Sequence, residues 1–237
     1  MSAQSKLIGT FPILNLSRQA CIKLLAILLC FPLFYKSSVP PNMKIGDGNP
    51  HKDSTFIFRI SDWSQASFYV YMSTNLGAPV LIFIQKLLQQ ESLFPGNNDF
   101  VRWNPLDSIG VILLIGGASL RLWSYKCLGK YFDYQVTIHE DHKIIRNGPY
   151  RVLRHPSYTG YMLARCGYFL FLRKAFTELV SKQHKNKILV MISLYYAWIC
   201  EGFLKRIMLE EHVMRGEFGE LYDKYKKETW RLVPYIF

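Results

Sequence analysis

The sequence predicts an all-α, polytopic integral membrane protein with about five transmembrane helices. Half of its 237 residues are hydrophobic and 15% are aromatic, yet the formal net charge is +12. Apolar spans that alternate with basic loops explain this combination better than a soluble core does. A helix needs roughly 20 residues to cross a bilayer, and five segments come close to that length. They cover residues 13–35, 68–88, 106–123, 156–172 and 188–208.

Charged side chains occur inside these segments. Arg18 and Lys23 lie in the first, and Arg121, Arg165 and Glu201 lie in the third, fourth and fifth. A charge within a span snorkels to its end or faces the interior of the bundle. We therefore expect Arg121 and Arg165 either to face an interior pocket or to pair with Glu201, and we favour the pairing.

The first segment has an alternative interpretation as a cleaved signal peptide, because Arg18 and Lys23 precede a short apolar run. No A-x-A-like cleavage site follows that run, and the later spans make a retained first helix the simpler interpretation. Either interpretation leaves the functional predictions for the later segments unchanged.

Basic residues are unevenly shared between the two sides of the predicted spans. The loops at 36–59 and 126–154 and the tail at 205–231 hold most of the lysines and arginines. The positive-inside rule therefore places the C-terminal tail and the loop carrying His155 in the cytosol. This basic face could also bind anionic lipid headgroups.

The chain divides into two parts. Residues 1–105 contain the N-terminal transmembrane helices and a polar, turn-rich connection at 36–62, whose Pro and Gly residues argue against a folded unit there. Residues 106–237 contain a ligand-binding loop, the last two spans and an amphipathic tail. We expect a cytosolic pocket formed by the 126–158 loop and the C-terminal helices.

Neither a metal site nor a disulfide framework is predicted. The five cysteines are scattered without C-x-x-C spacing and are expected to be packing residues. His139 and His142 could share a metal on a helix, but the alternation through residues 135–137 indicates extended chain. No carboxylate or cysteine completes a ligand set.

The loop at residues 131–158 is rich in hydrogen-bonding side chains. Pro156 suits the first turn of a helix, so the polar residues before it lie at the mouth of the fourth span. Such a loop, held by a rigid scaffold, is a frequent carrier of function. The alternative is an interfacial loop whose tyrosines and arginines lie at the headgroup level. The side chains concerned are Gln135, His139, His142, Tyr150, His155 and Tyr158.

A second charged group closes the fifth span. Arg206 and Glu210 are i, i+4 neighbours on one helical face, and Glu201 and Lys205 form a similar pair. As exposed salt bridges they would contribute only about 0.3–0.5 kcal/mol each. At the end of a membrane span, however, an arginine and a glutamate can bind ligand groups of opposite charge. The following residues 218–225 predict a short amphipathic helix with an aromatic face.

Taken together, these segments resemble the isoprenylcysteine carboxyl methyltransferases, which are integral membrane enzymes. The resemblance covers roughly residues 100–237, and its motifs are specific in combination. The matching residues are Gly148-Pro149-Tyr150, Arg154-His155-Pro156-Ser157-Tyr158 with Gly160, Glu210-Glu211, Phe218-Gly219 with Tyr222 and Tyr225, and Pro234.

This resemblance implies S-adenosyl-L-methionine-dependent methylation of the C-terminal prenylcysteine carboxylate of CaaX-processed proteins. The partners would be farnesylated or geranylgeranylated proteins and membrane lipids, the location the endoplasmic reticulum, and residues 106–237 the methyltransferase core. Arg206 would bind the substrate carboxylate and act as the catalytic residue in a direct methyl transfer. Cofactor contacts are implied for Gln135, His142, Lys143, Ile144, Ile145, Tyr150, His155, Pro156, Ser157, Tyr158 and Glu210.

Two other classes of protein share parts of this pattern. A phospholipid N-methyltransferase or a sterol-reductase-like membrane enzyme could carry related C-terminal motifs. A non-catalytic scaffold could bind lipid headgroups through the basic face. No nucleic acid partner and no metal cofactor are expected.

Overall fold

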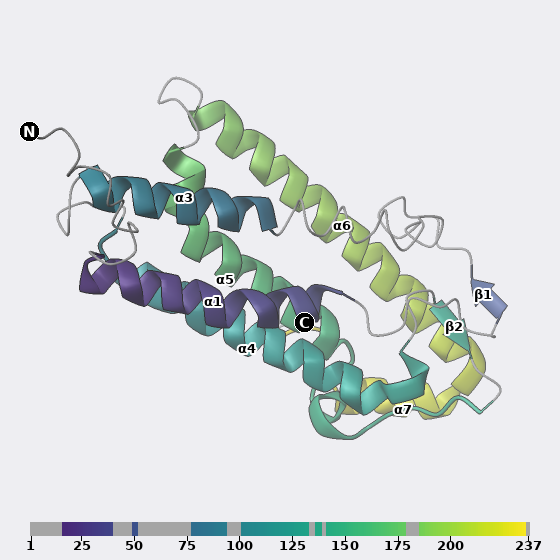
Figure 1. Cartoon of the computed structure of the whole chain (residues 1–237). Coiled ribbons are helices and arrows are strands. Elements are labelled where there is room, and N and C mark those ends of the chain that lie inside the picture. Colours follow the sequence, from purple (N-terminus) through teal and green to yellow (C-terminus); the bar gives the residue numbers. More distant parts are fainter. Residues whose placement is uncertain are drawn as a thin grey trace, which may run out of the picture.

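The computed structural model describes residues 16–39, 49–51, 77–93, 101–132, 136–138, 141–178 and 185–235. These ranges are mainly helical, as predicted (Figure 1). The long helices are α1 (Arg18–Ser38), α3 (Ala78–Leu93), α4 (Pro105–Leu128), α5 (Pro156–Glu178) and α6 (Lys185–Phe218). The shorter elements are α7 (Glu220–Glu228) and the single turns η4 (Gly129–Tyr131) and η5 (Gly148–Arg151).

A short pair of strands departs from the all-α prediction. β1 (Asn49–His51) pairs with β2 (Val136–Ile138) in antiparallel register, with Pro50 opposite Thr137. The extended chain at β2 agrees with the alternation in the sequence. Its pairing with β1 was not predicted, because residues 36–62 were interpreted only as a turn-rich connection.

Local signals define where the helices begin. The Ser17 hydroxyl accepts a hydrogen bond from the Ala20 amide at the start of α1. Asn104 and Asp107 form a capping box at the start of α4, with Pro105 in the first turn. These caps satisfy amides that have no partner inside the helix. α5 begins at Pro156, so the predicted helix start is confirmed.

α4 and α5 lie unusually close because glycines face each other across their contact. A Cβ atom added to Gly117 would lie 2.6 Å from the carbonyl oxygen of Gly160, and one added to Gly160 would lie 2.6 Å from that of Gly117. One added to Gly167 would lie 2.5 Å from the carbonyl oxygen of Gly110. Small residues at such contacts let helix backbones approach closely. This closely packed pair of helices forms the centre of the fold.

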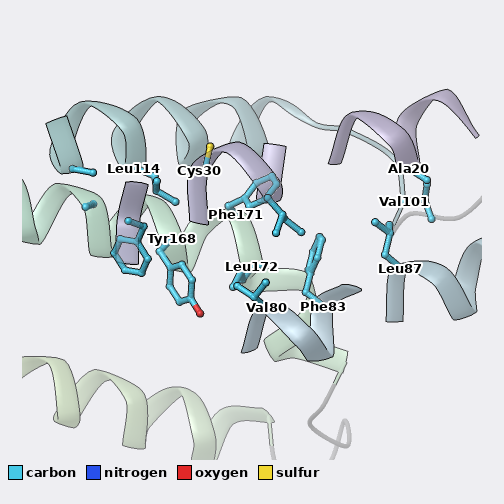
Figure 2. Packing of buried hydrophobic residues seen from close by; sticks show 14 residues of the cluster. Ala20, Cys30, Val80, Phe83, Leu87, Val101, Leu114, Tyr168, Phe171 and Leu172 are labelled. Carbon is cyan, nitrogen blue, oxygen red and sulfur yellow. The ribbon is translucent and has the colours of Figure 1, made fainter. Parts of the chain in front are cut away.

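The apolar core lies where α1 and α3 cover the α4 and α5 pair. Figure 2 shows Tyr168, Phe171 and Leu172 of α5 among the buried side chains of the other helices. The Phe171 ring lies 5.8 Å from the Phe83 ring of α3, and Tyr168 stacks on Phe34 of α1 at 4.6 Å. α5 therefore carries much of the packing that holds its first turn, and the residues before it, in place.

A cluster of charged side chains joins α1, α4 and α5 near the start of α4. Lys23 of α1 lies 3.3 Å from the Asp107 carboxylate of α4, and both side chains are 1% exposed. Arg173 of α5 donates to the other Asp107 oxygen at 2.6 Å. Buried charges of this kind are retained when they are paired and hydrogen-bonded. Of the two charged residues in the predicted first span, Lys23 therefore faces the interior of the bundle.

Two helices in the described ranges have the length and apolar composition of membrane spans, namely α1 and residues 105–131, which contain α4. Both expose large apolar side chains, such as Leu29 at 74% and Ile112 at 69%, as lipid-facing surfaces do. α3 contains a shorter apolar stretch over residues 79–89. The count of five spans and the division into two parts stay predictions.

The favoured pairing of Arg121 and Arg165 with Glu201 is wrong. Glu201 pairs with Lys205 one turn along α6, at 2.7 Å. Arg121 Nε instead donates to the Ser37 carbonyl at 2.8 Å, and Arg165 Nε donates to the Tyr161 hydroxyl at 3.0 Å. The i, i+4 lysine satisfies Glu201 locally, and the uncapped carbonyls at the end of α1 provide acceptors for Arg121.

Candidate active site

The residues before α5 form a tight turn fixed by a glycine. Gly148 has a φ of +55°, and a Cβ atom there would lie 2.6 Å from Cys127 Sγ of α4. Only glycine adopts this backbone conformation without strain and fits this space. The turn buries Tyr150, whose carbonyl accepts a hydrogen bond from the Tyr225 hydroxyl at 2.8 Å. The Gly-Pro-Tyr motif thus anchors the chain that leads to His155.

The C-terminal chain runs alongside this turn. We call residues 229–232 the strap. Trp230 donates its amide to the Val152 carbonyl at 2.9 Å and accepts the Arg154 amide at 2.7 Å. Arg231 accepts the His155 amide at 3.1 Å. The backbone of residues 152–155 is therefore held in parallel pairing by the strap.

α6 brings an arginine and a glutamate to the first turn of α5. Arg206 Nε donates to the Tyr158 hydroxyl at 2.8 Å and to Glu210 Oε1 at 3.0 Å. The Tyr158 hydroxyl donates to the same Glu210 oxygen, and His155 Nδ1 lies 3.4 Å from Glu210 Oε2. The predicted i, i+4 pair of Arg206 and Glu210 is confirmed. The two parts of the candidate site, about fifty residues apart in sequence, meet in space.

The neighbouring Glu211 makes a different set of contacts. Its carboxylate accepts from Arg154 Nε at 3.0 Å and from Arg231 at 3.0 and 2.8 Å, and it lies 3.3 Å from His155 Nε2. Its side chain is 7% exposed, whereas that of Glu210 is 24% exposed. Glu211 therefore joins protein segments to one another, whereas Glu210 is partly exposed.

The charged groups of this cluster shift one another's pKa towards the ionised forms. Burial by itself would raise the pKa of Glu210, but the His155 hydrogen bond and the Arg206 charge lower it to about 2. Burial would also raise the pKa of Glu211, but hydrogen bonds to His155 and Arg231 hold it well below its usual range. Burial would lower the pKa of His155, but hydrogen bonds to both glutamates raise it. Both carboxylates are thus ionised at neutral pH, and the protonated imidazole is favoured.

An aromatic group lies at the end of α6. The His142 ring lies 4.9 Å from the Tyr131 ring and 5.9 Å from that of Phe218. Lys143 is exposed and the two isoleucines after it are half-buried. The His142 ring is tilted by 37° and 57° relative to these two rings, and aromatic surface of this kind can pack against a planar ligand group.

The remaining predicted contacts lie around the cluster. Pro156 is buried, and Ser157 directs both its hydroxyl and its carbonyl to Arg121, at 3.2 and 2.9 Å. Gln135 and His139 lie outside the described residues. Within the described part of the chain no group of three metal-binding side chains gathers.

Sequence reasoning missed several residues that shape this site. Phe203 of α6 packs against the Tyr158 ring at 5.3 Å, and Arg231 supports the turn through Glu211. Phe203 precedes Arg206 by three residues, so helical spacing alone could have assigned it to the same face. No local pattern connects Arg231 with Glu211, twenty residues earlier.

The fold and this site define a helical protein with candidate membrane spans and a candidate polar ligand site at the start of one long helix and near the end of another. A carboxylate, a guanidinium, an imidazole and a phenol converge there, which suits a ligand carrying both positive and negative groups. Comparison with known proteins shows which family within that class the chain is similar to.

The model of the isoprenylcysteine carboxyl methyltransferase (ICMT) family matches residues 110–215. Protein-S-isoprenylcysteine O-methyltransferase B of Arabidopsis thaliana is 26% identical over 167 residues, which are 70% of this chain and 76% of that protein. Protein-S-isoprenylcysteine O-methyltransferase of Tribolium castaneum is 24% identical over 225 residues, 90% of this chain and 73% of that protein. A probable enzyme of the same name from Oryza sativa subsp. japonica is 27% identical over 151 residues, 63% and 70% of the two chains. Over residues 110–215 the chain is therefore similar to the ICMT family.

Proposed function

We propose that this protein is an S-adenosyl-L-methionine-dependent protein-S-isoprenylcysteine O-methyltransferase. The observation that carries the proposal is the cluster of His155, Tyr158, Arg206 and Glu210, because all four residues lie within the region that matches the family model. The names of the related proteins support methylation of an isoprenylcysteine carboxylate.

The side chains present fit the proposed methyl donor. When bound, S-adenosyl-L-methionine supplies a methyl group on a positively charged sulfur. Glu210, which is partly exposed, offers a carboxylate to the positive groups of that molecule, and His155 and Tyr158 offer polar contacts beside it. The ring of His142, between Tyr131 and Phe218, is suited to the adenine base. We propose the further contacts from Gln135, Lys143, Ile144, Ile145, Tyr150, Pro156 and Ser157 on the family resemblance alone.

Arg206 is the proposed substrate-binding and catalytic residue. A carboxylate is already ionised at neutral pH, so the transfer needs alignment and partial loss of water rather than a base. The guanidinium of Arg206 has a planar fork that matches a carboxylate. Its side chain is 6% exposed and is oriented by Tyr158 and Glu210, so little freedom is lost when it binds substrate.

The proposed substrate is lipid-like at one end. A farnesyl or geranylgeranyl group gains about 0.8 kcal/mol for each CH₂ that it buries, so lateral entry from the bilayer is favoured. In the five-span arrangement, the basic His155 loop and the C-terminal tail face the cytosol, where the soluble donor is present. We place the protein in the endoplasmic reticulum on the family resemblance, with membrane lipids as further partners.

Methyl transfer from labelled S-adenosyl-L-methionine tests the proposal in protein reconstituted into lipid nanodiscs. N-acetyl-S-farnesylcysteine should gain a base-labile methyl ester, whereas its carboxamide, phosphatidylethanolamine and a sterol should gain no label. Labelling of phosphatidylethanolamine instead would identify an N-methyltransferase. Absence of any labelled ester would refute the proposed function.

A matched pair of variants tests the role of Arg206. Arg206→Lys keeps the positive charge but loses the planar fork, so it should lose most of the activity. Lys205→Met is the control, because Lys205 is exposed and pairs with Glu201 on the outer side of α6. Equal activities in the two variants would contradict the assigned role.

A further inference from the structure

We propose that Arg231 is a positioning residue, which orients His155 and Glu210 for methyl-donor binding by holding the strap against the His155 turn. This inference rests on the proposed function. It assigns a role to the C-terminal chain, which contributes no side chain to the proposed ligand contacts.

The strap is joined to the turn by backbone hydrogen bonds at consecutive residues. Arg154 and His155 donate their amides to the carbonyls of Trp230 and Arg231, at 2.7 and 3.1 Å. One turn into α5, the Thr159 hydroxyl donates to the Leu232 carbonyl at 2.7 Å. The chain from Arg154 to the first turn of α5 therefore has its conformation set by the strap.

The Arg231 side chain adds a second link through α6. It donates Nε to Glu211 Oε1 at 3.0 Å and a terminal nitrogen to Oε2 at 2.8 Å. Two parallel bonds of this kind fix orientation as well as distance. Because α6 also carries Glu210, this contact sets the end of α6 relative to the His155 turn.

His155 completes the connection to the ligand site. Its two ring nitrogens lie 3.3 Å from Glu211 Oε1 and 3.4 Å from Glu210 Oε2. A movement of Glu211 therefore rotates the imidazole away from Glu210. The path from Arg231 through Glu211 and His155 to Glu210 consists of direct contacts at every step.

The other cations around Glu211 do not replace Arg231. Arg154 Nε reaches only Oε1, and it belongs to the turn that has to be positioned. Lys226 Nζ lies 3.9 Å from Oε2, beyond hydrogen-bond distance. Loss of Arg231 thus leaves Oε2 without a close donor from the strap.

The test compares Arg231→Met with Lys227→Met, which removes the same charge from the exposed end of α7. Affinity for S-adenosylhomocysteine, measured by calorimetry on the full chain in nanodiscs, should fall about tenfold in the first variant and less than twofold in the second. In turnover, the KM for the methyl donor should rise about tenfold while the KM for farnesylcysteine changes less than twofold. Unchanged affinity in folded Arg231→Met, or a loss confined to kcat, would overturn the inference.

Arg231→Lys keeps the test decisive if the methionine variant does not fold. The lysine retains the charge without the parallel bonds, so an intermediate affinity is expected and an unchanged affinity would overturn the proposal. On a Glu211→Gln background, the effect of Arg231→Met should shrink, as for two residues acting through one contact.

The wild-type protein separates the two proposals. If it binds S-adenosylhomocysteine but methylates no prenylcysteine, the proposed function fails and the affinity comparison still decides the role of Arg231. If it methylates prenylcysteine and the variants bind normally, only the role of Arg231 fails. If it does not bind S-adenosylhomocysteine, both proposals fail.

Discussion

The close contact of α4 and α5 predicts a sharp difference between two adjacent glycines. Gly117 faces α5, and an added Cβ atom would lie 2.6 Å from the Gly160 carbonyl oxygen and 2.9 Å from Leu163 Cβ. Gly116 is exposed, and an added Cβ atom would meet nothing within 4 Å. Gly117→Ala must therefore push the helices apart, whereas Gly116→Ala must not.

The magnitude follows from the required displacement. Ordinary contacts begin at 3.4 Å, so the helices have to separate by about 1 Å at Gly117. Overpacking of this kind costs about 1–3 kcal/mol. Both variants gain up to about 1 kcal/mol from the better helix propensity of alanine, so this gain cancels between them. At about 2–4 °C per kcal/mol for a chain of this size, Gly117→Ala should melt roughly 2–12 °C below Gly116→Ala.

Thermal unfolding followed by intrinsic fluorescence, at one scan rate in one detergent, measures this difference. The displaced α5 also carries Tyr158 in its first turn, so Gly117→Ala should bind S-adenosylhomocysteine more weakly than Gly116→Ala. Equal melting temperatures, or a higher one for Gly117→Ala, would show that the helices do not touch at this point.

Three further predictions concern the polar cluster. Arg206→Lys should lower kcat/KM for farnesylcysteine by about 100-fold, because the nucleophile loses its alignment, while the melting temperature shifts by only a few degrees; retained activity would contradict this role. Glu210→Gln should weaken S-adenosylhomocysteine binding about tenfold, since an amide lacks the charge that attracts a cation. Calorimetry measures this affinity, and an unchanged value would contradict the role of Glu210. The melting temperature should peak between two pH limits. Because the pKa of Glu210 is lowered by folding, this residue stabilises the fold above about pH 4.3, and its contribution is lost as the pH falls towards 2. Because the pKa of His155 is raised by folding, this residue stabilises the fold below about pH 6.5, and its contribution is lost as the pH rises through the raised pKa. His155→Gln should flatten the alkaline limb in a melting series across pH, and an unaltered limb would rule out His155 as its source.

Features set by neighbours in the sequence were predictable. Pro156 determines the start of α5, and the i, i+4 spacing fixes the pair of Arg206 and Glu210. The aromatic face of α7 is also as predicted, because Tyr222 and Tyr225 are both buried. In each case the residues that determine the structure lie within about one helical turn.

Features set by distant residues were not predictable from spacing. Glu210 and Glu211 are adjacent and chemically identical, yet one faces the candidate ligand site and the other an arginine of the strap. Their difference depends on where residues 154 and 231 lie after folding. The partner of Arg121 is likewise a backbone carbonyl of α1, and carbonyls carry no signal in the sequence. The resemblance to a family implied a cofactor contact for Glu210 and none for Glu211, but it named no partner for Glu211.

The length of α6 has a consequence for how two unlike substrates meet. Its 34 residues extend about 50 Å at 1.5 Å per residue, well beyond the roughly 30 Å of a hydrocarbon core. In the proposed span at 188–208, Arg206 lies at the membrane boundary and Glu210 stands one turn above it. A lipid-anchored tail can then reach the arginine without leaving the bilayer, and a water-soluble donor can reach the glutamate without entering it. In that proposed arrangement, one continuous helix would bring the two proposed reactants together at a boundary that neither has to cross.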